Sequence, residues 1–172
     1  MSRTIPIISR QAFEASSSDD AAICFVTITH PLAEAPILLV LDGADYLIDG
    51  VTWHRSEFEL DLLTDDDRPP SAPFRFPNVD RRAINMLAGV TIAARVDIEL
   101  VSSAYFDLTA DPRVVKPGVT IEKIYRAPAL RLTDITADEM MVEGTLLSWD
   151  YQQEEWPAAV VTEDLLPGVF AQ

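Results

Sequence analysis

The sequence predicts a mostly-β fold, a β-sandwich or split barrel with two short helices. Three observations lead to this prediction: a long alternating segment at residues 90–101, several shorter apolar or alternating runs, and turn-forming pairs between them. A chain of 172 residues is long enough to bury a full core in one domain. We therefore expect a single β domain over residues 1–172, with a short N-terminal helix and a docked C-terminal tail.

The clearest strand lies at residues 90–101, where apolar side chains at the even positions alternate with Thr91, Arg95, Asp97 and Glu99. A period of two is typical of a strand that buries one face. We expect further strands at residues 23–29, 37–41, 51–55, 58–62, 72–76, 119–125, 129–135 and 140–149. Nine strands indicate an all-β architecture.

Turn formers separate these runs. Asp-Gly pairs stand at 42–43 and 49–50, and a Pro-Gly pair stands at 117–118. Aspartate, proline and glycine favour turn conformations. The pair Glu143-Gly144 lies inside the last strand, where a glycine predicts a bulge or a bend.

Two short helices interrupt the strands, at residues 9–16 and 78–89. We expect Ser9 to cap the first of them, because a serine hydroxyl can accept a hydrogen bond from a free amide of the first turn. Two exposed excursions are expected as well. Residues 65–70 combine three adjacent aspartates with two prolines, and residues 107–117 show no apolar period.

The charge of the chain argues against binding nucleic acid through its phosphates. There are 28 acidic and 13 basic residues, which gives a formal net charge of −15. Such a chain repels phosphates, so we expect no sequence-specific nucleic-acid binding. No apolar run approaches the roughly 20 residues that span a bilayer, so we expect no membrane insertion.

Nitrogen and sulfur ligands are scarce. Cys24, His30 and His54 are the only cysteine and histidines, and a structural zinc site needs about four such ligands. Cys24 lies in an apolar stretch, which predicts a buried and inert thiol. We expect His30 and His54 to be surface or turn residues.

Acidic groups could in principle gather around calcium, at residues 65–67 or at Asp42, Asp45 and Asp49. Neither set has the EF-hand spacing. The chain also has no nucleophile elbow, zinc-protease motif, phosphate loop or dinucleotide fingerprint. We therefore expect no catalytic, metal or cofactor site, and no enzyme. The aromatic residues at 149, 151 and 156 favour core or interface packing over a carbohydrate platform.

The order of the segments resembles a family of tail-tip proteins of long-tailed phages, catalogued as a domain of unknown function and found in phages, prophages and gene transfer agents. The resemblance covers nearly the whole chain. It rests on these segments: ISRQAF at 8–13, VTITHP at 26–31, DGVTW at 49–53, residues 58–67 with the following Pro69-Pro70, FPNVDR at 76–81, Trp156-Pro157 and LPGVF at 166–170.

This resemblance implies a structural subunit like the distal tail proteins, which form a ring, expected to be a hexamer, between the tail tube and the distal hub or baseplate. It implies contacts with tail tube, tape-measure and tail hub proteins, and a place in the virion tail after assembly in the host bacterial cytoplasm. The expected subunit-interface residues are Trp156, Pro157, Leu166, Pro167, Gly168 and Phe170. The alternative is a stand-alone acidic β-sandwich that binds a ligand or catalyses a hydrolysis.

Overall fold

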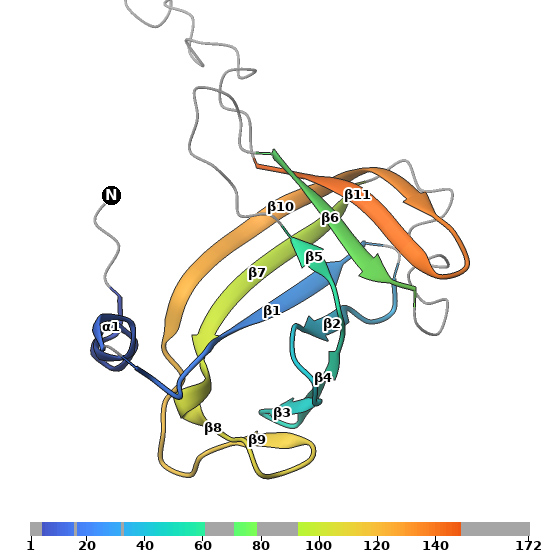
Figure 1. Ribbon diagram of the computed structural model, residues 1–172. Helices are drawn as coiled ribbons and strands as arrows, with labels where there is room; N and C mark the ends of the chain where they lie inside the picture. Colours follow the sequence, from blue (N-terminus) through green and yellow to red (C-terminus); the bar gives the residue numbers. More distant parts are fainter. Residues whose placement is uncertain (1–4, 16, 32, 61–70, 79–92, 149–172) are drawn as a thin grey trace, which may run out of the picture.

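The computed structural model describes residues 5–15, 17–31, 33–60, 71–78 and 93–148. Within these ranges eleven strands join in one sheet, in the order β5-β6-β11-β10-β7-β1-β2-β4-β3-β9-β8 (Figure 1). The elements are α1 (Ile7–Glu14), β1 (Ala22–Thr29), β2 (Ile37–Val40), β3 (Tyr46–Ile48), β4 (Val51–Arg55), β5 (Glu59–Leu60), β6 (Ser71–Pro77), β7 (Ala94–Ser102), the 3₁₀ turn η2 (Ser103–Tyr105), β8 (Phe106–Asp107), β9 (Arg113–Val115), β10 (Lys123–Ala137) and β11 (Met141–Leu147). The prediction of a mostly-β fold is confirmed.

Both faces of β1 are buried, and this divides the interior into two cores. Val26 and Ile28 point into the main core, whereas Ile23 and Phe25 point into the second core. The main core is formed by Cys24, Val26, Ile28, Leu39, Phe58, Phe74, Phe76, Ala94, Val96, Ile98, Ala127, Leu130, Leu132, Val142 and Leu146. The second core is formed by Ile23, Phe25, Val40, Tyr46, Val101, Tyr105 and Phe106.

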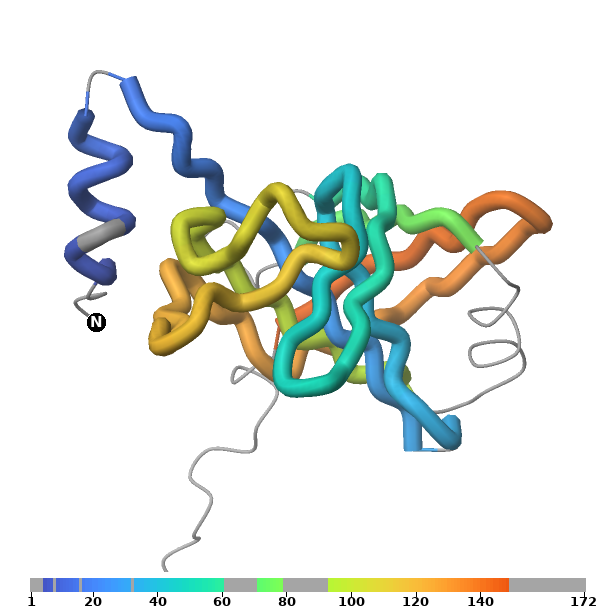
Figure 2. Tube along the Cα trace, turned by 90° about the horizontal axis from the view of Figure 1, so that it is seen from below, coloured from blue at the N-terminus to red at the C-terminus, as the bar shows by residue number. Residues whose placement is uncertain are grey.

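The sheet changes direction at a short parallel contact between β2 and β4. These strands pair at two positions, Leu39 with His54 and Val40 with Arg55. Beyond this contact, β3, β4, β8 and β9 form a small group of strands that covers the second core. Figure 2, a view from below, shows the β3–β4 and β8–β9 hairpins side by side in front of the long strands.

Strand β10 is one continuous strand, although the sequence predicts two strands at 119–125 and 129–135. Residues 119–122 lie outside it. Its pairing with β7 shifts register between Ala127 and Leu130, so Pro128 and Ala129 form a bulge instead of a break. Ala129 adopts a positive φ of 61°, and its amide donates a hydrogen bond to the carboxylate of Asp97 on β7.

The irregularity predicted at Glu143-Gly144 lies on the opposite strand. The register between β10 and β11 shifts between Thr133 and Thr136, so the additional residue belongs to β10 and faces Gly144. A Cβ atom at Gly144 would lie 2.7 Å from Leu132 Cδ1 and 3.1 Å from the Thr133 carbonyl oxygen. Glycine is needed here because the two backbones approach closely.

The expectation of an exposed excursion at 107–117 is only partly right: residues 108–109, 111–112 and 116–117 are exposed, but the rest of the segment is half-buried. This segment contains the end of β8 and all of β9, and Val114 and Val115 are half-buried. Strand β9 runs parallel to β3, a strand that the sequence analysis also did not predict. Both strands are three residues long, which is too short for an alternating pattern to be recognised.

Helix α1 begins earlier than predicted, and Ser9 does not cap it. Pro6 occupies the N-cap position, with a φ of −53°, and makes no side-chain cap. Proline suits a helix start because it has no amide hydrogen to satisfy. Ser9 lies inside the first turn, where its buried hydroxyl has no hydrogen-bond partner among the described residues. The second expected helix, residues 65–70 and the tail after 148 lie outside the described residues.

Candidate functional site

An open cavity of about 690 Å³ has the shape of a binding site and lies between the small group of strands, the end of β7 and the start of β10. Apolar side chains form most of its lining, and they come from strands that are distant in sequence. They include Phe25, Trp53, Val101, Phe106, Val115 and Ile121. A concave apolar surface of this size is typical of sites that bind a small molecule or a short segment of protein.

Aromatic contacts fix the base of this cavity. The ring of Phe25 on β1 meets Tyr46 edge-on at 5.4 Å and Trp53 edge-on at 5.2 Å between centroids. Tyr46 in turn meets Phe106 edge-on at 4.9 Å. Edge-to-face pairs of this kind add about 0.5–1.5 kcal/mol each beyond the area they bury. The base is therefore rigid, and it joins β1, β3, β4 and β8.

Polar groups lie at the rim of the cavity. Asp49 and Gly50 form the β3–β4 turn, with φ values of 51° and 80° that suit a tight hairpin. Glu99 and Lys123 also line the cavity and form an ion pair with each other. Arg126 Nε lies 3.3 Å from the same Glu99 oxygen. The Asp49 side chain is exposed, so it supplies negative charge to the rim.

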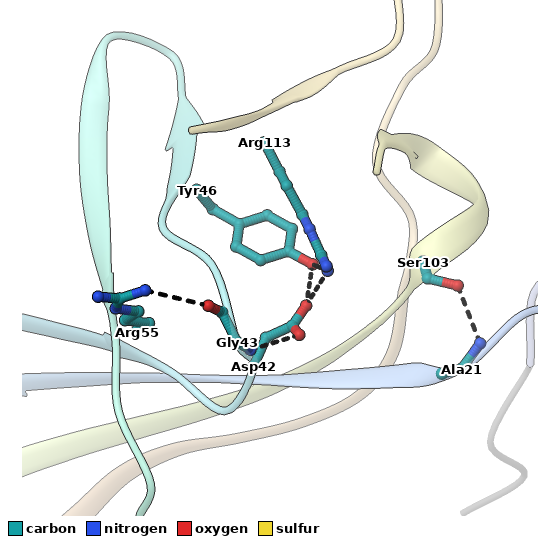
Figure 3. Close-up of polar contacts among 7 residues, drawn as sticks. All are labelled: Ala21, Asp42, Gly43, Tyr46, Arg55, Ser103 and Arg113. Atoms are coloured by element: carbon teal, nitrogen blue, oxygen red, sulfur yellow. Dashed lines mark hydrogen bonds and ion pairs between the residues drawn. The ribbon is translucent and has the colours of Figure 1, made fainter. Parts of the chain in front are cut away.

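Asp42, Tyr46 and Arg113 form a polar triad that stabilises the small group of strands. The carboxylate of Asp42 accepts hydrogen bonds from the Tyr46 hydroxyl and from the Arg113 guanidinium. Arg113 Nη1 also donates to the Tyr46 oxygen at 2.8 Å, and the guanidinium lies 5.6 Å from the centre of the tyrosine ring (Figure 3). Burial and the hydrogen bond to Asp42 raise the pKa of Tyr46 to about 12. The tyrosine is therefore protonated and acts as a donor to the carboxylate.

A second set of contacts holds the β2–β3 loop. Asp45 accepts a hydrogen bond from the backbone amide of Arg55 at 2.8 Å, and Arg55 Nη1 donates to the Gly43 carbonyl oxygen at 3.4 Å (Figure 3). His54 Nδ1 lies 3.7 Å from the Asp45 carboxylate. The Asp45 carboxylate and the Arg55 guanidinium are therefore already engaged within the protein and are not available to a ligand.

The acidic trio that was considered for calcium therefore does not form a site. Asp42 bonds to Tyr46 and Arg113, Asp45 bonds to the Arg55 amide, and Asp49 lies at the exposed hairpin turn. Across the described ranges, no three His, Cys, Asp or Glu side chains are grouped closely enough to hold a metal ion. The other candidate, residues 65–67, lies outside them.

The predictions for cysteine and histidine have mixed outcomes. Cys24 is buried, so the predicted burial of the thiol is confirmed, and burial raises the pKa of the thiol to about 11. His54 is exposed on β4, as expected for a surface residue. His30 lies in a turn at the end of β1, where its carbonyl oxygen accepts the Ala33 amide at 3.0 Å. A surface position is nevertheless wrong for His30, because its side chain is buried.

The predicted interface residues, Trp156, Pro157, Leu166, Pro167, Gly168 and Phe170, all lie outside the described residues. The cavity itself was not predicted from the sequence. A signal for it exists in the apolar residues on either side of the predicted turns, at 47–48, 114–115 and 119–121. Their convergence depends on the β3–β9 pairing, which no local pattern reveals.

A family model described as a domain of unknown function, DUF1833, matches residues 8–160. The chain belongs to the DUF1833 family. This match includes every strand from β1 to β11 and most of α1, and it ends before the predicted interface residues at 166–170. A comparison with curated proteins finds no match to this DUF1833 chain. Among its described residues, no helix has the length and apolar character needed to cross a membrane.

Proposed function

We propose that this DUF1833 chain is a structural subunit of the tail tip of a long-tailed phage or phage-like particle, where copies form a ring that joins the tail tube to the distal hub. The support for a ring comes from two strand edges and one helix whose surfaces stay exposed among the described residues. Among the described residues the sheet ends at β5 and β8 without a further paired strand, and α1 lies apart from the sheet (Figures 1 and 2) with Ile7 and Phe13 exposed. Open edges and exposed apolar side chains favour completion by neighbouring subunits.

Exposed apolar residues are also present at the end of the molecule that carries the cavity. Val51 follows the β3–β4 turn, Leu108 follows β8, and Val119 lines the cavity itself. Between 39% and 48% of each of these residues is exposed. Apolar surface beside a concave site is typical of a protein–protein contact. In a cyclic ring each contact joins two different patches, so a projecting element on one copy needs a concave site on the next.

The charge of the chain suits the centre of a tail. In this proposal part of the net charge of −15 faces the centre of the ring, where it repels DNA and lets it pass without binding. The phage setting comes from the sequence resemblance, which also provides the proposed sixfold symmetry and the neighbours: tail tube, tape-measure and hub proteins. In this proposal the chain is not an enzyme, and it assembles in the host bacterial cytoplasm before it becomes part of the virion tail.

Two measurements test this function. Mass spectrometry of purified particles from the encoding genome should detect the chain, and electron microscopy of isolated tails should place antibody label at the tip. Negative-stain images of the concentrated chain should show rings. Particles that contain the neighbouring tail proteins but lack this chain would contradict the proposal, and so would label along the whole tail.

The C-terminal segment provides a second test. In this proposal residues 156–170 supply part of the subunit interface through Trp156, Pro157, Leu166, Pro167, Gly168 and Phe170. Deleting the residues after Trp156 should therefore prevent ring or tail assembly while a soluble, folded chain remains, as judged by circular dichroism. Normal assembly of the shortened chain would contradict the interface assignment.

The alternative function, a stand-alone ligand-binding or hydrolytic domain, is favoured by the cavity of about 690 Å³. A saturable 1:1 titration with the apolar dye 1-anilinonaphthalene-8-sulfonate would support it, provided that Val115→Phe, which places a larger side chain in the cavity, abolishes binding. In the ring proposal the same cavity is covered in the assembled state, so dye binding should fall when the rings form.

A further inference from the structure

Helix α1 carries an exposed stripe with a cation at its centre. Ile7, Arg10 and Phe13 are spaced by three residues, which places them side by side on the helix surface. All three are exposed, Ile7 at 73% and Phe13 at 57%. The helix also turns its smaller side chains, Ser9 and Ala12, away from this stripe. Among the described residues, most of the surface of Ile7 and Phe13 stays uncovered.

The segment that follows the helix is attached at one end of the sheet. The amide of Ala21 donates to Ser103 Oγ at 2.9 Å, and the amide of Ser103 donates to the Ala21 carbonyl oxygen at 2.8 Å (Figure 3). Ser103 begins the 3₁₀ turn η2, which leads directly into β8 and to Phe106 at the base of the cavity. The helix therefore projects from the same end of the molecule that holds the cavity.

The cavity is complementary to the stripe. Its walls are apolar, with the exposed Val119 at its edge, and the exposed carboxylate of Asp49 stands at its rim. The helix stripe thus has apolar side chains on either side of a cation, and the cavity has apolar walls beside an anion. An amphipathic helix that inserts a few anchors into a groove is a recurrent mode of recognition, and a helix of eight residues is about 12 Å long.

We propose that α1 of one copy docks in the cavity of the next copy, with Ile7 and Phe13 against the apolar walls and Arg10 beside Asp49. This inference rests on the proposed ring and names one of its contacts. None of the residues that line the cavity comes from α1 of the same chain. The helix and the cavity are two different surface patches, so a contact between them is heterologous, which is the type that closes a ring.

Cross-linking between two variants tests the contact directly. The only cysteine, Cys24, is buried and inert, so introduced thiols can be modified selectively. A short bismaleimide added to a mixture of Phe13→Cys and Val119→Cys chains should give a covalent dimer of one chain of each type. The control mixture replaces Val119→Cys with Met140→Cys, a more exposed position between β10 and β11, and it should give at least about tenfold less dimer although its thiol is easier to reach. An equal yield in both mixtures overturns the proposal.

The double variant Phe13→Cys/Val119→Cys separates docking between copies from docking within one chain. A cross-link that forms inside a monomer, at a concentration where the mixed variants give no dimer, would show that the helix fills its own cavity and would overturn the proposal.

Exchange of charge between the helix and the rim of the cavity gives a second measurement. Arg10→Glu and Asp49→Lys should each weaken association in native mass spectrometry by about two- to fivefold, and their combination should restore it.

These outcomes are distinct from those that test the function. Rings that form at the tail tip without the Phe13–Val119 cross-link would overturn the docking of α1 and leave the proposed function intact. If the cross-link is specific but the chain is absent from tails, the proposed function is overturned and the docking of α1 stands.

Discussion

The guanidinium of Arg113 forms an ion pair with the carboxylate of Asp42, which lies 71 positions earlier in the chain. Each of these side chains is 22% exposed. The pair connects β9 with the loop that follows β2, and the Tyr46 hydroxyl bonds to both partners. The triad therefore determines where the small group of strands, and with it the cavity, lies relative to the main sheet.

Replacement of Tyr46 by phenylalanine should lower the free energy of unfolding by about 1–2 kcal/mol. The change removes a donor to Asp42 and an acceptor for Arg113 in a buried position, and hydrogen bonds to charged groups are among the stronger ones. Urea denaturation followed by circular dichroism measures the effect. Tyr105→Phe is the matched control, because the buried Tyr105 hydroxyl has no hydrogen-bond partner among the described residues. Its loss should leave stability unchanged or slightly higher, and equal losses for the two variants would contradict the role of the triad.

Replacement of Gly144 by alanine should destabilise the fold by about 1–3 kcal/mol. The new methyl group would lie 2.7 Å from Cδ1 of the buried Leu132 and 3.1 Å from the Thr133 carbonyl oxygen, so the Leu132 side chain must move within the core and the β10 backbone must give slightly. Gly43→Ala is the control, since a Cβ there meets no atom within 4 Å and the backbone has no positive φ. Thermal unfolding of both variants compares the two sites. A stable Gly144→Ala chain would show that β10 and β11 separate easily.

The Cys24 thiol should resist modification in the folded chain. Burial raises its pKa from 9.0 to about 11, so almost no thiolate exists at pH 8. Ellman's reagent should therefore react in 6 M urea and not in buffer. Rapid reaction of the native chain at pH 8 would mean that the main core opens easily.

The same shift predicts a change of stability with pH. Because the pKa of Cys24 is higher in the folded state, the stability it contributes is complete below pH 9 and is lost as the pH rises through 11. Between pH 8 and 11 the wild-type chain should therefore lose more stability than Cys24→Ala, by about 2–3 kcal/mol. Urea midpoints of both chains across this range measure the difference, and parallel curves would refute it.

Replacement of Asp97 by alanine should cost about 1–2 kcal/mol, because the amide of Ala129 in the bulge loses its acceptor. Arg95→Ala is the comparison, since Arg95 lies 3.3 Å from the same carboxylate but is 57% exposed. An exposed ion pair contributes little, so that variant should change stability by less than about 0.5 kcal/mol. If both variants lose the same amount, the role of Asp97 lies in the ion pair and not in the bulge.

Strands with a long alternating pattern were predictable from the sequence. The apolar residues Val96 and Ile98 alternate with Arg95, Asp97 and Glu99, and this segment forms β7. Strand β1 was predicted at residues 23–29, but the burial of both of its faces was not. The residue types and the alternation within a single segment were sufficient to predict such strands.

The candidate site could not be predicted in this way. Its edge depends on β3 and β9, each of three residues, and these pair across more than sixty positions of the chain. His30 was expected at the surface or in a turn; it does lie in a turn, and the burial of its side chain was not predictable from the proline beside it. Burial of this kind is decided by tertiary packing and not by neighbours in sequence.

Strand β1 belongs to both cores, and this has a mechanical consequence. Cys24 and Val26 point to one side while Phe25, between them, points to the other and forms the base of the cavity. Close-packed interiors transmit strain instead of absorbing it. Any force applied to Phe25 from the cavity is therefore passed through one backbone to the opposite core and on to β6, β10 and β11. Because β1 belongs to both cores, a displacement at the cavity would reach the main core without a hinge.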